Sequence, residues 1–510
     1  MIHIFHSAGE SEIDWDGKPV SILQLLRDND IFIDSPCSGR GKCGKCRIVG
    51  RGDLSEPTEG ERVHLSASDL SSGVRLACST KITGANAEIR VPRQQKMEIV
   101  TEGTGETKAL DPLGKELGLA VDIGTTTVAA YLYDLRTGTR LGSAVAKNPQ
   151  STFGADVVSR QEYSIKGGAE ELARVIRSCI GELAGELIGK AGRSISDIDS
   201  AVITGNTTML YLLCAYDVKD IALYPFASEH LFGEFFKATE FFADFSPDCQ
   251  VYLPPCISAY VGADITCAIL SSGMLSSGEN TLLTDIGTNG ELALSAGGRL
   301  LCCATAAGPA FEGAGIELGS NALPGAVDRV WADGNNIRIH TIGNAAPKTI
   351  CGSGLLDALA VFIQLGKVDE TGRLESTNGA PVYLGDSSVY ISQSDVRNIQ
   401  LAKAAIRAGI ETLLFRAGLT DKTAPRLLIA GGFGSKLNPE SAARIGMIPE
   451  NMLKRSLAIG NAAGLGAVNL LLDKNNIEEC GRIIEKASVL ELSTDPKFSD
   501  SFMEQIAFEV

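Results

Sequence analysis

Four cysteines near the start of the chain have the spacing of a metal-binding loop. Cys37, Cys43 and Cys46 fall within ten residues and Cys78 follows later, which gives the pattern C-x5-C-x2-C and then a distant C. Cysteine thiolates are the usual ligands of iron–sulfur clusters, and four of them can hold a [2Fe–2S] centre. The loop also contains glycines, which permit the left-handed backbone of a tight turn. The spacing therefore predicts that these four cysteines are the metal ligands of a [2Fe–2S] cluster.

Zinc and structural thiols are the alternatives for these cysteines. Structural zinc sites usually have two short paired spacings, whereas this chain has one C-x2-C and two single cysteines. A disulfide framework is typical of small secreted domains. The loop is one residue longer than the C-x4-C-x2-C run of plant-type ferredoxins. We favour the cluster and keep both alternatives open.

Two later segments with the same internal order could bind phosphate. Val121-Asp122-Ile123-Gly124-Thr125-Thr126-Thr127 and Thr284-Asp285-Ile286-Gly287-Thr288-Asn289-Gly290 each follow an apolar run. Each aspartate therefore lies at the end of a strand, where it can hold Mg²⁺ through water. A Gly-Thr turn offers backbone N–H groups and hydroxyls to phosphate oxygens. Two such hairpins predict a clamp for a nucleoside triphosphate, with Asp122 and Asp285 as catalytic candidates.

Three further glycine-containing segments follow expected strands. They are Ile203-Thr204-Gly205-Asn206-Thr207-Thr208, Ala430-Gly431-Gly432-Phe433-Gly434-Ser435 and Ile459-Gly460-Asn461-Ala462-Ala463-Gly464. In chain order, the whole set resembles the phosphate, connecting and adenosine motifs of the actin-like ATPase superfamily of sugar and acetate kinases, Hsp70 and actin. The resemblance implies two ribonuclease-H-like lobes around an ATP cleft. It places Gly205, Asn206, Gly431 and Gly432 at the nucleotide.

Two acidic residues near the second hairpin are weaker candidates. Asp264 lies where sugar kinases of this superfamily place a catalytic base, so it could position water, although a helix-capping or structural aspartate is the favoured interpretation. Glu312, in Gly308-Pro309-Ala310-Phe311-Glu312-Gly313, is a candidate nucleotide contact.

The elements that must position these residues divide the chain into four parts. Residues 1–93 have the strand–strand–helix–loop order expected of a β-grasp ferredoxin domain. Residues 94–115 are polar and poor in apolar side chains, as in a flexible linker. Strands then alternate with helices, which argues for α/β architecture. We expect a first actin-like lobe with an insertion at 116–280 and a second lobe at 281–510, with helices near 169–189, 352–365 and 395–418.

A ferredoxin-type domain joined to an actin-like ATPase resembles one family over essentially the whole chain, the reductive activators of corrinoid-dependent methyltransferases. The resemblance implies ATP-dependent one-electron reduction of a cobalt(II) corrinoid protein to cobalt(I), with electrons passing through the cluster. The implied cofactors are the [2Fe–2S] cluster, ATP and Mg²⁺. The implied partners are the corrinoid protein and a low-potential electron donor, and a homodimer is also considered. The alternative function is a redox-sensing iron–sulfur ATPase that regulates a partner without reducing it.

Composition and sequence pattern limit the partners and the cellular compartment that we expect. The net charge of −16 argues against nucleic acid as a partner. No secretory signal precedes the first strand, and no uncharged apolar run is long enough to span a membrane. The remaining cysteines show no second metal pattern and are read as buried thiols of a reducing compartment. We therefore expect a cytoplasmic protein with no membrane partner.

Overall fold

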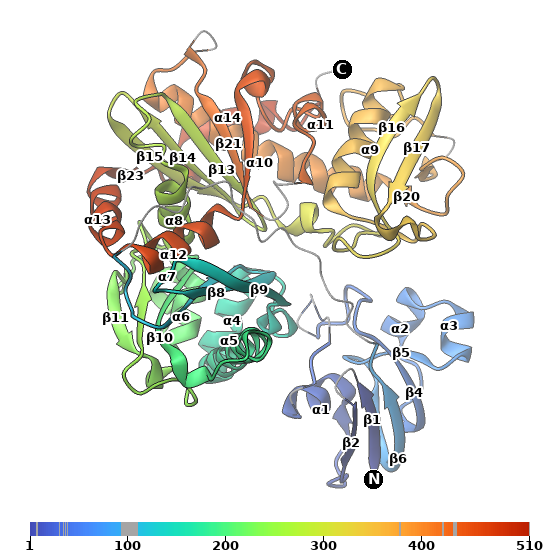
Figure 1. The fold of residues 1–510 in the computed structure, drawn as a ribbon. Coiled ribbons are helices and arrows are strands. Elements are labelled where there is room, and N and C mark those ends of the chain that lie inside the picture. The colour runs from blue at the N-terminus through green and yellow to red at the C-terminus, as the bar shows by residue number, and fades with distance from the viewer. Residues whose placement is uncertain are drawn as a thin grey trace. The chain divides into compact units, whose positions relative to one another are not determined.

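The computed structural model describes residues 1–6, 9–29, 31–33, 35, 37, 39–92, 111–376, 379–420, 423–431 and 436–508. The chain forms two compact units (Figure 1). Unit 1 comprises Met1–Lys96 and Asn148–Ile176, and unit 2 comprises Met97–Lys147 and Arg177–Val510.

Unit 1 contains a mixed sheet in the order β2-β1-β6-β4-β5, with β3 paired to β6. Strands β1 and β6 are parallel and the other neighbours are antiparallel. The bounds are β1 Ile2–His6, β2 Gly9–Ile13, β3 Val20–Ser21, β4 Arg47–Leu54, β5 Val74–Leu76 and β6 Lys81–Arg90.

One face of this sheet packs on helix α1 (Ile22–Asp28), whose first turn is capped by the Ser21 side chain. Ile2, Ile4 and Leu26 are fully buried in the shared core. Helices α2 (Glu59–His64) and α3 (Ala67–Ser71) lie between β4 and β5 in the chain. The loop that carries Cys37, Cys43 and Cys46 therefore runs from the end of α1 to the start of β4, and Cys78 follows β5.

A segment from the middle of the chain also belongs to unit 1. It contains η1 (Pro149–Thr152), α4 (Val157–Tyr163), the π-helical turn η2 (Ser164–Gly168) and the start of α5 (Ala169–Ala191). The buried Arg27 guanidinium donates to the Thr152 carbonyl and lies 4.9 Å from the centroid of the Phe153 ring. Arg40 forms an ion pair with Glu162 at 2.6 Å. We call this segment, residues 148–176, the clasp.

Unit 2 contains two six-stranded sheets of related topology (Figure 1). In each sheet the first strand is antiparallel to the next strand of the chain and parallel to a later one. The first sheet has the order β11-β12-β10-β7-β8-β9 and the second β22-β21-β13-β14-β15-β23. The strands are β7 Leu117–Ile123, β8 Thr127–Asp134, β9 Thr139–Lys147, β10 Ile198–Gly205, β11 Glu234–Lys237, β12 Gln250–Leu253, β13 Thr281–Ile286, β14 Gly290–Ala296, β15 Arg299–Thr305, β21 Arg426–Ala430, β22 Ser456–Gly460 and β23 Ala487–Val489.

Two helices with small residues cross each other within unit 2. Residues of α8 (Ala263–Ser272) join the core of the second sheet, and residues of α12 (Ala462–Leu472) join that of the first. A Cβ at Gly466 would lie 2.1 Å from the Cys267 carbonyl oxygen. The helices therefore approach to backbone contact at a position that only glycine can occupy.

The remaining elements of unit 2 cover these sheets and build a smaller lobe. That lobe has the strands β16 Ala326–Asp333, β17 Asn336–Thr341, β18 Thr349–Ile350, β19 Val382–Tyr383 and β20 Tyr390–Ile391. The other helices are α6 Thr207–Cys214, α7 Lys219–Ala222, α9 Gly352–Gln364, α10 Gln393–Ala417, α11 Pro439–Arg444, α13 Asn476–Lys486 and α14 Pro496–Glu504. Short helical turns are η3 Ile195–Asp197, η4 Ala238–Glu240, η5 Pro309–Glu312, η6 Ile342–Asn344, η10 Glu450–Arg455 and η11 Leu492–Thr494.

The predicted fold class is confirmed, because a ferredoxin-like sheet precedes a duplicated αβ architecture. The predicted helices correspond to α5, α9 and α10. Most of the predicted linker, residues 94–110, lies outside the described residues. Its last part is folded, since Leu113 N–H donates to the Leu471 carbonyl at 3.0 Å and Asp111 pairs with Lys474 at 2.9 Å. The boundaries between the four predicted parts stay a prediction.

Candidate functional site

The cysteine loop brings its sulfur atoms together in two pairs. Cys37 Sγ lies 3.4 Å from Cys43 Sγ, and Cys46 Sγ lies 3.3 Å from Cys78 Sγ. Strand pairing supports the second pair, because Ala77 N–H donates to the Cys46 carbonyl at 2.8 Å. The glycines of the loop adopt left-handed conformations, with φ of 83° at Gly39, 70° at Gly41 and 63° at Gly44.

The two pairs are neighbours, since Cys37 interacts electrostatically with Cys78 and Cys43 with Cys46. Two sulfurs on one tetrahedral metal, with bonds of about 2.3 Å, lie about 3.7 Å apart. Each pair therefore has the spacing for one metal ion, and two adjacent pairs fit the two irons of a [2Fe–2S] cluster. Cys46 is buried while the other three cysteines are partly exposed.

A buried ion pair supports β5, the strand that ends just before Cys78. Glu61 is fully buried and accepts hydrogen bonds from Arg75 Nε at 2.9 Å, Leu76 N–H at 3.0 Å and Thr80 Oγ1 at 2.8 Å. Burial opposes the charge, yet the hydrogen bonds from Arg75 and from backbone N–H groups lower the pKa of Glu61 to about 2. This network fixes β5 against α2, next to Cys78.

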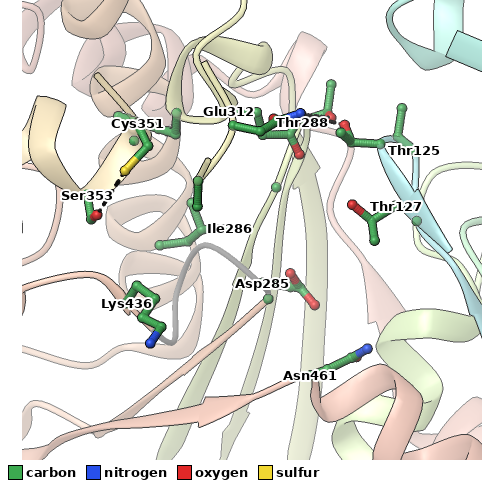
Figure 2. A pocket seen from close by; sticks show the side chains of 18 of the residues that line it. Thr125, Thr127, Asp285, Ile286, Thr288, Glu312, Cys351, Ser353, Lys436 and Asn461 are labelled. Atoms are coloured by element: carbon green, nitrogen blue, oxygen red, sulfur yellow. Dashed lines mark hydrogen bonds between the residues drawn. The ribbon is translucent and has the colours of Figure 1, made fainter. Parts of the chain in front are cut away.

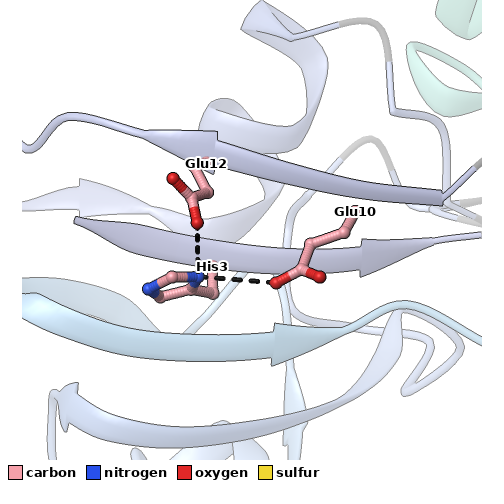
Figure 3. Close-up of side chains that lie close together, drawn as sticks. All are labelled: His3, Glu10 and Glu12. Atoms are coloured by element: carbon pink, nitrogen blue, oxygen red, sulfur yellow. Dashed lines mark ion pairs between the residues drawn. The ribbon is translucent and has the colours of Figure 1, made fainter.

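A second group of possible ligands lies on the outer face of the same sheet. His3 Nδ1 is 3.5 Å from Glu10 Oε1 and 3.4 Å from Glu12 Oε1 (Figure 3). His3 and Glu12 are direct cross-strand partners, and all three side chains are partly exposed. Opposite-charge pairs of this kind are common on solvated sheet faces, so cross-strand pairing explains the group.

The two Asp-Gly-Thr segments form hairpin turns that face one cavity of about 640 Å³ in unit 2. Gly124 N–H donates to the Thr127 carbonyl at 2.8 Å, and Gly287 N–H donates to the Asn289 carbonyl at 3.1 Å. In Figure 2, Asp285 lies between Thr127 and Lys436. The predicted residues that line the cavity are Asp122, Gly124, Thr125, Thr126, Thr127, Asn206, Asp264, Asp285, Gly287, Thr288, Asn289, Glu312 and Gly431.

Three predicted residues are not among those lining the cavity. Gly205 and Gly290 are buried packing positions, where a Cβ would lie 2.8 Å from the Ile123 carbonyl oxygen and 2.6 Å from Thr305 Oγ1. Gly432 lies outside the described residues. Gly431 has a φ of 95° and faces Asp285, whose Oδ1 would lie 2.6 Å from a Cβ there.

Four carboxylates converge at the floor of the cavity. Burial raises the pKa of Asp122 to about 6 and that of Asp285 to about 7. Burial and the charges of Asp285 and Asp122 raise the pKa of Asp264 to about 8. The fourth group is Glu291, whose pKa burial and the three aspartates raise well above its usual value. Such a cluster is suited to a hard divalent cation, which favours the ionised carboxylates.

Sequence reasoning missed Glu291, although a signal for it existed. In the second hairpin Glu291 is the cross-strand partner of Asp285, whereas the first hairpin has Ala129 opposite Asp122. Residues directly opposite each other in a hairpin have neighbouring side chains. The predicted repeat therefore placed position 291 beside the catalytic candidate. Asp264 does not cap its helix, since the N-cap of α8 is Gly262.

Hydroxyl and amide groups complete this part of the cavity. Thr126 Oγ1 and Thr288 Oγ1 both donate to Glu312 Oε2, at 2.7 and 2.8 Å. Asn206 Nδ2 donates to Thr125 Oγ1 at 3.3 Å. In each of these contacts, both residues had been predicted for the nucleotide site, although they are far apart in the sequence.

Residues from α12 and the smaller lobe also reach the cavity; the start of α12 belongs to one of the predicted glycine-containing segments, whereas the smaller lobe was not predicted. Asn461, the N-cap of α12, hydrogen-bonds Asp122 and donates to Tyr131 Oη at 3.2 Å. From the smaller lobe, Asp328 Oδ1 lies 2.6 Å from His340 Nδ1. The sequence of this lobe contains no repeated motif and no characteristic spacing, so these residues could not be predicted from it. Others lining this side are Arg329, Cys351, Ser353 and Lys436.

Among the described helices, none has the length and apolar character needed to cross a membrane.

Comparison with known proteins matches three parts of the chain to known domain families. Residues 7–83 match the 2Fe-2S iron–sulfur cluster binding domain, and 117–277 match the RACo middle region. Residues 279–510 match the C-terminal domain of RACo, the ASKHA domain. The chain thus combines an iron–sulfur domain with an actin-like ATP-binding domain.

Relatives of this architecture are aligned over most of their length. The corrinoid activation enzyme RamQ of Eubacterium limosum is 32% identical, over 77% of this chain and 70% of that protein. The [Co(II) methylated amine-specific corrinoid protein] reductase of Methanosarcina barkeri is 26% identical, over 77% of each chain. A solved structure, a reductive activator for corrinoid,iron-sulfur protein, is 29% identical with a TM-score of 0.73 and covers 100% of this chain and 98% of that one. The paired thiols, the two-hairpin cleft and these relatives together show that the chain belongs to the RACo family of corrinoid reductive activators.

Proposed function

We propose that this protein reduces the cobalt(II) form of a corrinoid protein to cobalt(I), one electron at a time, with the help of ATP. The observation that carries the proposal is the presence, in one chain, of two thiol pairs and a cleft between two Asp-Gly-Thr hairpins. Relatives that align with most of this chain are named as activators or reductases of corrinoid proteins. Those names favour electron transfer over the alternative of a regulatory ATPase.

At the iron–sulfur end, Cys37 and Cys43 would hold one iron and Cys46 and Cys78 the other. The bound cluster supplies one-electron transfer. Cys46 is buried, whereas both cysteines of the Cys37–Cys43 pair are partly exposed, as is Cys78. We propose that the Cys37–Cys43 edge faces the electron acceptor, because electron transfer requires close approach to the partner.

At the nucleotide end, we propose that the two hairpins bind the ATP phosphates through other backbone N–H groups of their turns and through their threonine hydroxyls. Asp122, Asp285 and Glu291 would hold Mg²⁺, directly or through water. Asp264 would orient the water that attacks the terminal phosphate. The raised pKa values of these carboxylates support a site that becomes fully ionised when a cation binds.

The need for ATP follows from redox potentials. Plant-type [2Fe–2S] clusters lie near −400 mV, and we expect the cobalt(II)/cobalt(I) couple to lie lower. Each 59 mV of uphill transfer costs about 1.4 kcal/mol for one electron. ATP can offset this cost only if the nucleotide-bound protein binds one docked state of the partner more tightly than another.

Formation of cobalt(I) in candidate corrinoid proteins tests the proposal. Each candidate is mixed with the cluster-loaded protein, a chemical reductant and Mg-ATP, and the cobalt(I) absorption is recorded. The reaction should require both ends of the chain, so Cys43→Ser and Asp285→Asn should each abolish it. Cobalt(I) formation that persists in Cys43→Ser would contradict electron transfer through the cluster.

We also propose that the protein takes electrons from a low-potential donor and that it forms a homodimer. A donor of lower potential than the cluster is required by the direction of electron flow. A homodimer would be checked by the mass of the purified protein in solution, where a monomer would contradict it.

A further inference from the structure

Glu312 takes the hydrogen bonds that the two phosphate-binding hairpins offer. Thr126 belongs to the first hairpin and Thr288 to the second, 162 positions later in the chain. Both hydroxyls donate to the same oxygen, Oε2 of Glu312, at 2.7 and 2.8 Å (Figure 2 shows the Thr288 contact). One carboxylate thus joins both hairpins across the cleft.

A phosphate oxygen could not receive these two hydrogen bonds at the same time. A threonine hydroxyl has a single O–H donor, and both donors are already directed at Glu312. A phosphate placed there would also lie against the negative charge of the carboxylate, which is unfavourable in a partly buried cavity. Glu312 and a phosphate group are therefore alternative occupants of one position.

The surroundings of the carboxylate agree with this interpretation. A Cβ at Gly287 would lie 4.0 Å from Glu312 Oε1, so the carboxylate sits over the turn whose backbone faces the cavity. The short helical turn η5 that ends at Glu312 is flanked by Gly308 and Gly313, with φ of 74° and 79°. Phe311 beside it is buried in the core of the second lobe. Phe311 thus anchors the backbone of this turn in the core, and the Glu312 carboxylate faces the cavity.

We infer that Glu312 is an internal stand-in for the terminal phosphate of ATP, held by Thr126 and Thr288 until a nucleoside triphosphate displaces it. The assignment rests on the proposed ATP site. The terminal phosphate is the group that must approach the carboxylate cluster at Asp285 if Mg²⁺ and water act on it. A diphosphate ends before this position and leaves Glu312 in place, so release of Glu312 distinguishes the two nucleotides.

The inference predicts how affinity changes when the competitor is removed. A ligand that binds only the open fraction of a protein has its apparent affinity reduced by that fraction. If Glu312 occupies the position in most molecules, Glu312→Ala should tighten binding of a non-hydrolysable triphosphate by about fivefold to tenfold. Binding of ADP should change by less than about twofold, because ADP does not compete with Glu312.

Isothermal titration of the full-length, cluster-loaded protein tests this without any corrinoid partner. AMP-PNP and ADP, each with Mg²⁺, are titrated into the wild type, Glu312→Ala and Glu312→Gln. Glu312→Gln preserves the size of the side chain, and its neutral amide oxygen is a weaker acceptor. It should tighten AMP-PNP binding by a smaller factor than Glu312→Ala, which also keeps the test usable if the alanine variant folds poorly.

Two controls separate displacement from a general charge effect. Asp328→Asn removes a carboxylate from the same cavity that is paired with His340 and contacts neither hairpin hydroxyl. It should not change the ratio of AMP-PNP to ADP affinity. Adding Thr288→Val to Glu312→Ala should remove much of the gain for AMP-PNP, because the freed hydroxyl is then absent.

Weaker AMP-PNP binding in Glu312→Ala would overturn the inference, because it would make Glu312 a direct ligand. Equal tightening for AMP-PNP and ADP would also overturn it. Neither result depends on cobalt reduction, so each would leave electron transfer untouched. Absence of any nucleotide binding by the wild type would instead contradict the proposed function.

Discussion

At the scale of single residues, two glutamates with different neighbours have different roles. Glu61 is buried against Arg75 and holds a strand in place. Glu312 faces a cavity and accepts hydrogen bonds from the Thr126 and Thr288 hydroxyls. A buried charge with a charged partner is costly to change, whereas a carboxylate bound by neutral hydroxyls can be exchanged for another anion.

The ligand assignment predicts the effect of removing one thiol. Cys43→Ser should lose most of the visible absorption of the cluster, because Cys43 and Cys37 together are assigned to one iron. Nucleotide affinity should stay near the wild-type value, since the hairpins have their own core. Cys214→Ser, at the end of α6, is the matched control and should keep the full spectrum. An unchanged spectrum in Cys43→Ser would remove that residue from the ligand set.

Glu61→Gln should destabilise unit 1 by about 3–5 kcal/mol, the usual cost of removing one partner of a buried ion pair. The folded pKa of Glu61 is about 2, below its ordinary value. The carboxylate therefore contributes stability that is fully present above about pH 4.5 and is lost as the pH falls toward 2. Denaturant unfolding should show a constant gap between variant and wild type from pH 8 to pH 5. A gap that closes at pH 6 would contradict the assignment.

At the scale of elements, the crossing of α8 and α12 positions the nucleotide cleft. Asp264 lies in the first turn of α8, and Asn461 caps α12 and contacts Asp122. The backbones meet where Gly466 faces the Cys267 carbonyl. Any side chain at position 466 would separate the two helix starts and shift both polar groups.

Gly466→Ala should therefore lower stability by about 1–3 kcal/mol through overpacking and weaken nucleotide binding, with the cluster spectrum preserved. Gly185→Ala is the control on α5, where a Cβ meets open space. That change should be neutral or stabilise by up to about 1 kcal/mol. Thermal unfolding and nucleotide titration of both variants decide the matter, and equal behaviour of the two would refute the close crossing.

Much of this architecture was predictable because repeated motifs lie at strand ends. The order Asp-Ile-Gly-Thr occurs at residues 122 and 285, and its duplication predicted two facing hairpins. Asp328 and His340 could not be predicted, because they reach the cavity through the fold of a separate small sheet. The clasp was missed for the same reason. Its contacts with Arg27 and Arg40 join positions that are distant in sequence and follow no period.

At the scale of the whole molecule, the clasp gives the ferredoxin-type domain a second connection to the ATPase half. Residues 148–176 belong to unit 1 by their contacts, while the chain on both sides of them belongs to unit 2. The domain is therefore held by noncovalent contacts as well as by the covalent linker. Strand β9 of unit 2 leads directly into the clasp.

This arrangement predicts that cutting the linker does not release the domain. With a specific protease site inserted near residue 103, the cleaved wild type should elute as one complex in size-exclusion chromatography. Arg27→Ala removes the contacts with Thr152 and Phe153 and should allow the pieces to separate. Arg51→Ala, an exposed position on β4, is the control and should stay intact. Separation of the cleaved wild type would show that the clasp contributes little.

The central claim, that ATP drives the electron from the cluster to cobalt, is tested most directly at a fixed donor potential. The cluster is kept reduced at a potential too high to generate cobalt(I) by itself, and the cobalt(I) absorption of a corrinoid partner is followed. We predict that cobalt(I) accumulates with Mg-ATP and fails to accumulate with ADP, without nucleotide, or with Asp285→Asn. Equal accumulation in the absence of ATP would contradict the account.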